Sequence, residues 1–214
     1  MEAIVDLIGV GVSLGGRPVL RDIDLSLASG EVLGVVGPNG SGKTTLIRTL
    51  ATLTSIDVGH GSVLGAPLAG NQLREVRRRI GLIGHQPSLI QELTLNENLA
   101  HVAKLSGLDP GRALRALEIV GLEDAADRRA DACSFGMRRR AEIARLLLTK
   151  PDLLLLDEAS SGLDDAANGL IRALMGSTTG RGGGVVMVSH DAAMITELTE
   201  TVLSIESGRL GAAR

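Results

Sequence analysis

One glycine-rich segment combines the residue types and the spacing that bind phosphate. It reads GPNGSGKT over residues 37–44, which fits the pattern G-x-x-x-x-G-K-[ST], and Thr45 follows it. In such a loop the glycines let backbone N–H groups turn toward the phosphates, a lysine reaches the β- and γ-phosphates, and a threonine hydroxyl helps to hold Mg²⁺. The nucleotide-binding residues expected from this pattern are Gly37, Pro38, Asn39, Gly40, Ser41, Gly42, Lys43, Thr44 and Thr45. Thr44 is the expected magnesium ligand among them.

Two adjacent carboxylates end a later apolar run, LLLLDE over residues 153–158. Taken alone, they could simply be two acids at the end of a strand. In a parallel sheet, however, the strand ends form the ligand crevice, which would place them near the phosphate loop. Asp157 could then bind Mg²⁺ through its water shell. Glu158 could orient or deprotonate the water that attacks the γ-phosphate. Loop and acids together predict a site that binds a nucleoside triphosphate such as ATP with Mg²⁺ and hydrolyses it.

The apolar pattern around the loop predicts the elements that position it. Residues 32–37, VLGVVG, form a continuous apolar run that ends in glycine, typical of a strand buried on both faces of a parallel sheet. Residues 44–53 carry Leu46, Ile47, Leu50 and Leu53 at helical spacing. The positive end of that helix would point at the bound phosphates. Residues 22–27 alternate between polar and apolar, which predicts a half-exposed strand.

The remainder of the chain divides into a helical stretch and further strands. Thr94 and Glu97 form a T-x-x-E capping box at the start of one helix within the largely helical stretch 92–150. Leu114, Leu117 and Val120 mark another helix, which Gly121 stops. After it come the strand run at 153–156, a second apolar run, VVMVSH, and a hairpin around Gly208. The pattern predicts an α/β core interrupted by a helical insert, with antiparallel strands at the front.

Composition limits the classes of partner. The 214 residues carry a formal net charge of −3 and a pI of about 5.8, so we expect no nucleic-acid partner. No apolar run is long enough to cross a bilayer, and no charged-then-apolar leader suggests a signal peptide. The single cysteine excludes an internal disulfide and agrees with a reducing cytosol. If the protein serves a membrane, it is expected to dock onto another chain.

In motif order and over nearly its whole length, the sequence resembles the nucleotide-binding subunits of ATP-binding-cassette (ABC) transporters. Gln86, in GHQP, is similar to the family's Q-loop glutamine, which touches Mg²⁺ and the attacking water and senses the membrane partner. The resemblance implies that Gln86 is catalytic, as Glu158 is. It also implies that Gln86 helps to bind the metal, together with Thr44 and Asp157. His190, in VSHD, is similar to the switch histidine that contacts the γ-phosphate and is catalytic in the family.

Two further motifs resemble parts that act across a dimer. Ser134, Gly136 and Met137, in CSFGM, are similar to the signature that caps the γ-phosphate of ATP held by the opposite subunit. Residues 161–164, SGLD, are similar to the D-loop, and Asp164 would lie at the dimer seam and contribute to the nucleotide site. The resemblance implies a second ATP-binding subunit, identical or not, which pairs head to tail with this one.

The resemblance also implies the fold and its division. We expect a P-loop NTPase core with a RecA-like, mostly parallel sheet, an N-terminal antiparallel β subdomain and an inserted α-helical subdomain. The whole chain, 1–214, would form one ABC-type ATP-binding domain. Its core lobe would comprise 1–86 and 150–214, and its helical lobe 87–149. The chain ends soon after the last motif, so no regulatory C-terminal domain is expected.

Three positions depart from the family pattern. Phe135 stands where the signature has its first glycine, and it would be strained if that position required φ > 0. Ala159 replaces the proline that is common after the catalytic glutamate. Leu14, just before Gly15 and Gly16, matches the position of the aromatic residue that stacks on adenine. Stacking on a ring contributes roughly 1–3 kcal/mol per base, so a leucine there predicts weaker ATP affinity and loose base selectivity.

Several other residues have plain structural interpretations. Arg138, Arg139 and Arg140 are expected to form a solvated helix face. Cys133 is interpreted as a small buried residue, and Ser134 could be an ordinary helix N-cap. The other histidines match no family chemistry and are given no functional role; they are His60, His85 and His101.

The expected function is that of the ATPase subunit of an exporter whose permease lies on another chain. Residues 80–108 are similar to the ATPase subunit of the haem exporter of cytochrome c maturation, and drug and lipid exporters share much of the pattern. The expected location is peripheral, on the cytoplasmic face of the inner membrane. The permease would supply a short helix that docks near Gln86.

Two functions of other classes are open alternatives. Soluble cassette ATPases that act on DNA or ribosomes carry long coiled-coil inserts or two cassettes, and this sequence shows neither. A GTPase could read guanine with Thr149, Lys150 and Asp152 in LTKPD. Against the GTPase, Pro151 is better interpreted as part of a turn before the strand. In addition, no D-x-x-G switch follows the phosphate loop.

Overall fold

The computed structural model describes residues 3–70, 73–159, 165–199 and 201–212. The chain forms two compact units. The first, here called the sheet unit, comprises residues 1–82, 151–158 and 178–214; the second, the helical unit, comprises 83–150 and 159–177. The sequence placed only 87–149 in a helical lobe, whereas in the structure 159–177 group with the helices as well.

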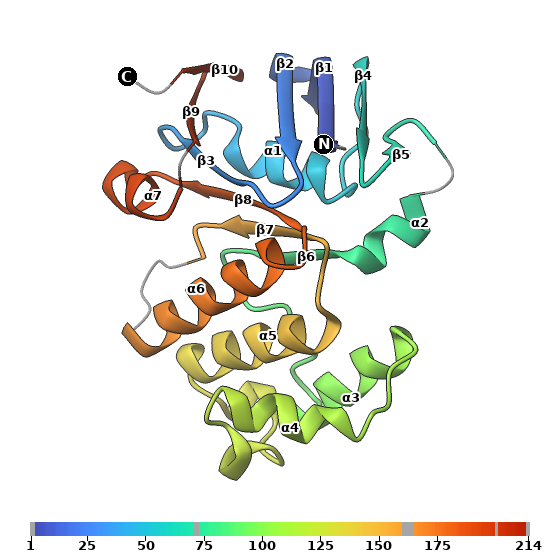
Figure 1. Cartoon of the computed structure of the whole chain (residues 1–214), viewed down its shortest axis with the longest axis vertical. Helices are drawn as coiled ribbons and strands as arrows, with labels where there is room; N and C mark the ends of the chain where they lie inside the picture. The colour runs from blue at the N-terminus through green and yellow to red at the C-terminus, as the bar shows by residue number, and fades with distance from the viewer. Residues whose placement is uncertain (1–2, 71–72, 160–164, 200, 213–214) are drawn as a thin grey trace. The chain divides into compact units, whose positions relative to one another are not determined.

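The first sheet of the sheet unit is antiparallel, with strand order β2-β1-β4-β5 (Figure 1). It contains β1 (Ala3–Leu14), β2 (Arg17–Ala28), β4 (Val58–Val63) and β5 (Ala66–Pro67). Ile23, Leu25 and Leu27 are buried on β2 and the polar residues between them are exposed. The alternation read from residues 22–27 is therefore confirmed, because a sheet with one wet face buries every second side chain.

The second sheet has the order β10-β9-β3-β8-β7-β6. Its strands are β3 (Val32–Val36), β6 (Ile80–Ile83), β7 (Leu153–Asp157), β8 (Gly184–Ser189), β9 (Thr201–Glu206) and β10 (Arg209–Ala212). β3 pairs in parallel with β8 and β9, and β7 pairs in parallel with β8. β9 and β10 form the predicted hairpin around Gly208. The apolar run at 32–37 is thus a central parallel strand, as predicted.

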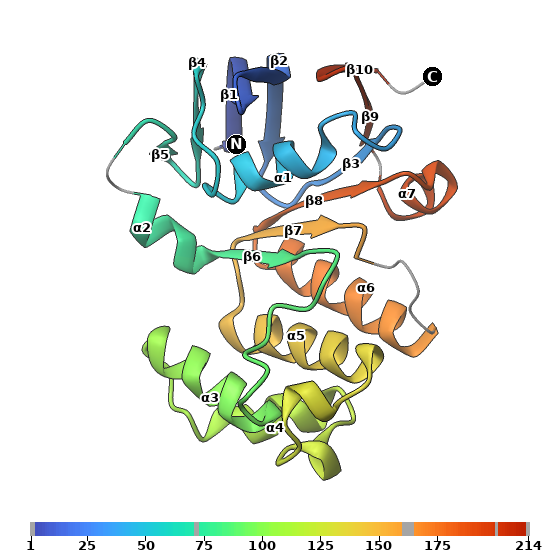
Figure 2. The ribbon, with the colours of Figure 1, turned by 180° about the vertical axis from the view of Figure 1, so that it is seen from behind.

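Helix α1 (Lys43–Leu50) follows the phosphate loop and packs against β7 and β8 (Figure 2). Leu46, Ile47 and Leu50 are buried in one core with both sheets. The prediction that the helix reaches Leu53 was wrong: the helix ends at Leu50, and Leu53 is exposed. Other helices of this unit are α2 (Leu73–Val76), the short helix η1 (Arg77–Arg79) and α7 (Ala192–Leu198).

The helical unit contains α3 (Leu95–Leu105), α4 (Arg112–Ile119), α5 (Phe135–Thr149) and most of α6 (Asp165–Thr179), with short turns η2 (Glu123–Ala125) and η3 (Ala130–Ala132). The capping box is confirmed, because the side chain and backbone of Thr94 and Glu97 exchange both hydrogen bonds. The helix predicted around Leu114 and Leu117 is confirmed as α4, in which Leu117 is buried and Leu114 is exposed. Within the described ranges, no helix combines the length and the apolar character that crossing a lipid bilayer requires.

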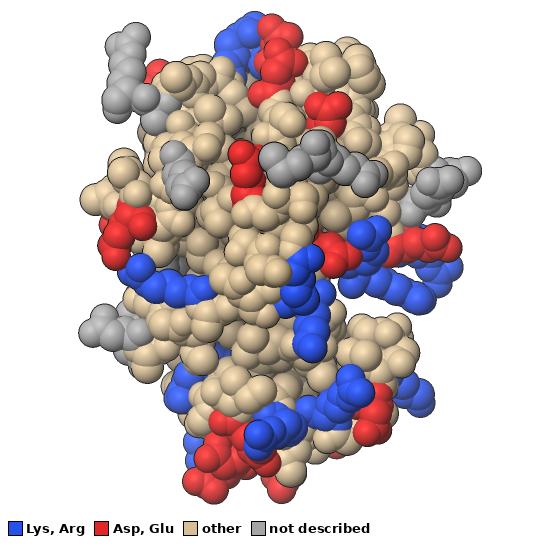
Figure 3. All heavy atoms as spheres, viewed as in Figure 1, with Lys and Arg blue, Asp and Glu red and all other residues tan. Residues whose placement is uncertain are grey.

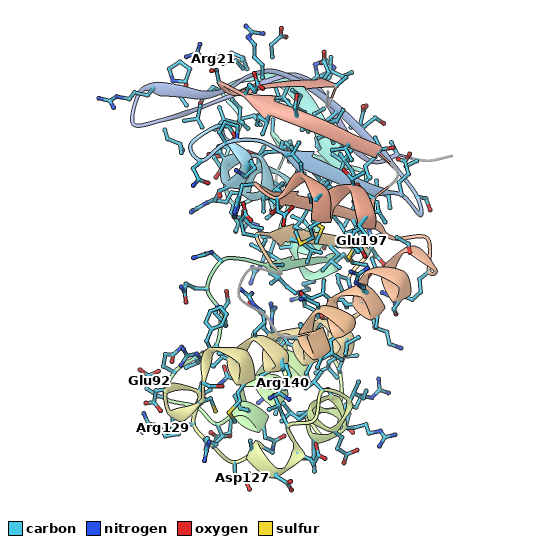
Figure 4. All side chains as sticks on the ribbon, turned by 90° about the vertical axis from the view of Figure 1, so that its left-hand side faces the viewer. Arg21, Glu92, Asp127, Arg129, Arg140 and Glu197 are labelled. Carbon is cyan, nitrogen blue, oxygen red and sulfur yellow. The ribbon has the colours of Figure 1, made fainter. Side chains whose placement is uncertain are left out.

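The three consecutive arginines of α5 do not form a solvated face, so that prediction was wrong. Arg139 is buried in an ion pair with Glu142. Arg138 donates to the carbonyl of Cys133, and Arg140 donates to the carbonyls of Val120 and Gly121 at the end of α4. Arg140 points from α5 into this unit (Figure 4). On the helical unit, other Lys and Arg side chains lie beside Asp and Glu (Figure 3).

Candidate functional site

The loop between β3 and α1 has a backbone that only glycine accommodates at several positions. Gly40 and Gly42 have φ of 79° and 112°, in the region that side chains rarely adopt. A Cβ added at Gly37 would lie 2.3 Å from the carbonyl oxygen of Ile205. The loop is therefore shaped by its glycines, and α1 begins directly after it at Lys43.

Lys43 and Ser41 present polar groups inside this loop. The side chain of Lys43 is buried, and its Nζ donates to the carbonyl oxygens of Gly37 (2.6 Å) and Pro38 (3.1 Å). Ser41 is also buried, and among the described residues its Oγ has no hydrogen-bond partner. A buried polar atom without a partner is costly, and a phosphate oxygen is a group that would accept from it. The loop therefore fits an anion such as the phosphates of a nucleotide.

The carboxylates of Asp157 and Glu158 line one pocket with the loop. β7 ends at Asp157, which is buried, and Glu158 then adopts a left-handed backbone conformation with φ of 52°. The pocket has a volume of about 250 Å³, and its lining residues are Val19, Asn39, Gly40, Gly42, Lys43, Thr44, Thr45, Asp157 and Glu158. A lysine, two threonines and two acids line one small volume, which suits a phosphate with a divalent cation.

Glu158 is held by the last residue of β8 and by the residue that follows it. Its Oε2 accepts from the hydroxyl of Ser189 at 2.8 Å, and its Oε1 accepts from the backbone N–H of His190 at 2.9 Å. Nδ1 of His190 lies 3.0 Å from the same Oε1. Because an ionised carboxylate only accepts, Nδ1 must carry a proton in this arrangement. The contacts fix the carboxylate of Glu158 in one orientation.

The same contacts set the charge of Glu158. Burial by itself raises the pKa of a carboxyl group, but the hydrogen bonds from His190 and Ser189 and the proximity of His190 outweigh it. The net result is a pKa of Glu158 below its usual 4.5. Glu158 is therefore ionised at neutral pH, and it is a weak base.

Ser189 was not identified as a site residue from the sequence. It is buried, and its Oγ both donates to Glu158 and accepts from the N–H of Asp191 at 3.1 Å. The available signal was its place in VSHD, directly before the predicted switch histidine. Leu14, the last residue of β1, is half exposed, and its contact with adenine stays a prediction.

The other predicted residues lie in the helical unit or outside the described ranges. Gln86 is exposed in the irregular segment after β6. Ser134 is the N-cap of α5, where its Oγ accepts from the N–H of Met137 at 3.2 Å, and Gly136 lies in the first turn. Phe135 is helical and has no positive φ, so the strain considered for it does not arise. Residues 161–164, with Asp164, lie outside the described residues.

A buried parallel strand, a glycine loop that opens a helix, and an acid pair at the end of β7 define a phosphate-loop nucleotide-binding domain. A family model described as ABC transporter matches residues 20–161. The chain therefore belongs to the ABC transporter family. By this membership it is an ATP-binding ATPase domain, and the predicted fold class is confirmed.

Curated relatives support the same assignment. The Nod factor export ATP-binding protein I of Rhizobium johnstonii is 36% identical over 209 residues, which cover 96% of this chain and 67% of that protein. The methionine import ATP-binding protein MetN of Bordetella avium is 37% identical over 204 residues, which cover 92% and 56%. These relatives do not support the predicted haem exporter or a role in cytochrome c biogenesis, because their names describe other transport systems.

Solved structures agree with the fold. An ATP-binding subunit of an ABC transporter matches with a TM-score of 0.88 and 26% identity over 98% of this chain and 90% of its own length. A dimeric ATP-binding cassette, in a post-hydrolysis state bound to ADP and Pi, matches with a TM-score of 0.85 and 26% identity over 98% and 99%. ATPase subunits of this family work as pairs with membrane permeases.

Proposed function

We propose that this chain binds ATP with Mg²⁺ and hydrolyses it to power export through a separate membrane permease. The observation that carries the proposal is the single pocket shared by Lys43, Thr44, Asp157 and Glu158. The direction that we propose is that of the Nod factor export relatives, whereas the methionine relatives of similar identity are importers. The chain would act at the cytoplasmic face of the inner membrane, as one of two paired ATP-binding subunits.

The sheet unit would bind the triphosphate. Lys43 would exchange its bonds to the loop carbonyls for bonds to the β- and γ-phosphates, while the backbone N–H groups of the loop surround the phosphates. Thr44 and Asp157 would hold Mg²⁺, and Gln86 would contact the ion as well. When bound, Mg²⁺ neutralises charge on the β- and γ-phosphate oxygens. Charge-assisted contacts of this kind contribute roughly 1.5–3 kcal/mol each.

Glu158 would act mainly by orienting the attacking water. A general base works best when its pKa lies near the operating pH, and the pKa of Glu158 is lowered instead. A fixed carboxylate can still accept a hydrogen bond from water and align its lone pair with the γ-phosphate. His190, which is 61% exposed and in contact with Glu158, would reach the γ-phosphate itself.

The helical unit would serve the ATP of the partner subunit. Ser134 caps the N-terminus of α5, and a helix N-terminus attracts anions. We propose that Ser134, Gly136 and Met137 cap the γ-phosphate on the opposite subunit, with Asp164 at the seam. The dimeric solved relative supports this pairing.

The variant Glu158→Gln tests the proposal. It should bind ATP, lose turnover and accumulate as an ATP-bound dimer, because the amide keeps the shape but not the charge of the carboxylate. ATPase assays and size-exclusion chromatography with ATP and Mg²⁺ would measure both effects. Glu92→Gln, at an exposed glutamate of the helical unit (Figure 4), is the matched control and should behave as the parent. If Glu158→Gln hydrolysed ATP at the parent rate, Glu158 would have no catalytic role. If the parent protein did not bind ATP in the presence of Mg²⁺, the proposal itself would be contradicted.

A further inference from the structure

Helix α5 contains an ion pair that is sealed from solvent. Nη1 of Arg139 lies 2.7 Å from Oε2 of Glu142, and the side chains are 1% and 0% exposed. Arg145, one turn further along, lies 3.9 Å from the other oxygen of Glu142. Charged side chains are rarely buried this completely, so the pair needs a physical explanation.

Both members of the pair also bind the segment that contains Gln86. Nη2 of Arg139 donates to the carbonyl oxygen of His85 at 3.0 Å. Oε1 of Glu142 accepts from the backbone N–H of Ser88 at 3.0 Å. His85 and Ser88 flank Gln86 on its two sides, and residues 84–88 have no regular secondary structure. The backbone around Gln86 is therefore anchored to α5 from both ends.

The pair is also connected to the start of α5. The ring of Phe135 lies against the guanidinium of Arg139, with 5.4 Å between the ring centre and Cζ. An arginine over an aromatic face is attracted by the ring quadrupole. Phe135 follows Ser134, the N-cap of the helix. One continuous set of contacts thus runs from Ser134 through Phe135 and Arg139 to the segment around Gln86.

Stability alone gives a poor account of this pair. Removing two charges from water costs several kcal/mol for each ion, so a buried pair rarely stabilises a fold more than apolar side chains of equal volume would. Moreover, Nε of Arg139 is buried without a hydrogen-bond partner among the described residues. The pair does fix a position, because two charge-assisted hydrogen bonds hold the backbone of residues 85 and 88 at one place along α5.

We infer that Arg139 and Glu142 are positioning residues that fix Gln86 relative to the N-terminus of α5, so that the Q-loop and signature segments move as one body. The inference rests on the proposed function, since it gives Gln86 and Ser134 their roles in ATP hydrolysis. Arg139 and Glu142 would not contact the nucleotide themselves. Their effect passes through the backbone on either side of Gln86.

The first test uses the parent protein. Ser88 is exposed and lies in an irregular segment, where an amide hydrogen normally exchanges quickly. Because its N–H is bound to a buried carboxylate, we expect hydrogen exchange at Ser88 to be slowed at least about ten-fold relative to an unstructured amide. Nuclear magnetic resonance would measure it residue by residue. Exchange at the unprotected rate would overturn the inference without any variant.

The second test replaces the pair by apolar residues of similar volume, Arg139→Met with Glu142→Leu. Removing both charges avoids leaving one of them buried and unpaired. We expect faster exchange at Ser88 and a kcat for ATP hydrolysis lowered roughly ten-fold or more, since misplacing a catalytic group is costly. The KM for ATP should stay within about two-fold, because the phosphate loop is unchanged.

Arg140→Met is the matched control. It removes an arginine of the same helix whose bonds go to carbonyls at the end of α4 and not to the Q-loop segment. It should lower stability yet leave exchange at Ser88 and kcat unchanged. A double variant with parent-like exchange and kcat, or a control that lowers kcat equally, would overturn the inference. An inactive parent would instead contradict the proposed function, so the two failures are distinguishable.

Discussion

Ser189→Ala is the substitution for which the structure gives the sharpest expectation. The change deletes one oxygen, which donates to Glu158 at 2.8 Å and accepts from the N–H of Asp191 at 3.1 Å. A hydrogen bond to a charged group contributes roughly 1.5–3 kcal/mol, and one between neutral groups about 1 kcal/mol. The carboxylate is 17% exposed, so its bond belongs at the lower end of that range. We expect the free energy of unfolding to fall by about 2 kcal/mol at neutral pH.

The loss should depend on pH. The pKa of Glu158 is lowered in the folded protein, so its ionised form stabilises the fold above the ordinary value of 4.5. This contribution is lost as the pH falls through the lower, folded pKa. Ser189→Ala removes part of it, and the difference between variant and parent should therefore shrink at acid pH. Urea unfolding at neutral pH and at the lowest pH at which the parent stays folded would measure both values.

A matched control separates the charge effect from the loss of a hydroxyl. Ser29 donates to the carbonyl oxygen of Gly182 at 2.7 Å, a neutral partner, so the loss in Ser29→Ala should be smaller and independent of pH. Turnover provides a second measurement: kcat of Ser189→Ala should fall about ten-fold, the factor that about 1.4 kcal/mol represents. A loss of stability equal at both pH values, with parent-like kcat, would refute the reasoning.

Three shorter predictions follow. Lys43→Met removes the ammonium that lies inside the phosphate loop, so the Kd for ATP, measured calorimetrically, should rise roughly ten- to hundred-fold; an unchanged Kd would contradict its role. Leu14→Tyr should tighten ATP binding by roughly 1–3 kcal/mol, because a ring could stack on adenine at this half-exposed position. Equal dissociation constants would argue against that contact. Thr94→Ala deletes the cap of α3 and should lower the unfolding free energy by about 1 kcal/mol, a loss that urea titration would detect or exclude.

The features that could be predicted from the sequence are those with local causes. The run at 32–37 is apolar on both faces because both faces of β3 are covered. This pattern can be recognised from the segment alone. The capping box at Thr94 and Glu97 is a contact between residues three apart. The phosphate loop is likewise continuous in sequence, so its glycines and Lys43 could be identified together.

Side chains whose environment comes from elsewhere in the chain were missed. Arg139 was interpreted as exposed because arginines usually are, yet Glu142, three residues later on the same helix, was a signal for a pair. The helix after the loop was extended to Leu53 because periodicity alone does not show where a chain turns; Thr52 turns it with φ of 59°.

The surroundings of Glu158 illustrate the same limit. Ser189 and His190 reach it because β7 and β8 pair in parallel, with Asp157 opposite Val188. The N–H of Glu158 then donates to the carbonyl of Val188 at 3.1 Å. This pairing joins residues about thirty positions apart, and no local pattern in either segment specifies it. Motif order suggested that the two segments meet, but not which atoms hold the carboxylate.

The left-handed backbone at Glu158 has a consequence for the two acids. In an extended strand, neighbouring side chains leave opposite faces, so a strand continued through residue 158 would send one carboxylate away from the other. At Glu158 φ is positive and the strand has ended, and both acids line the same pocket. A valine or isoleucine at 158, which resists this twist, would straighten the tip and lose orientation as well as charge.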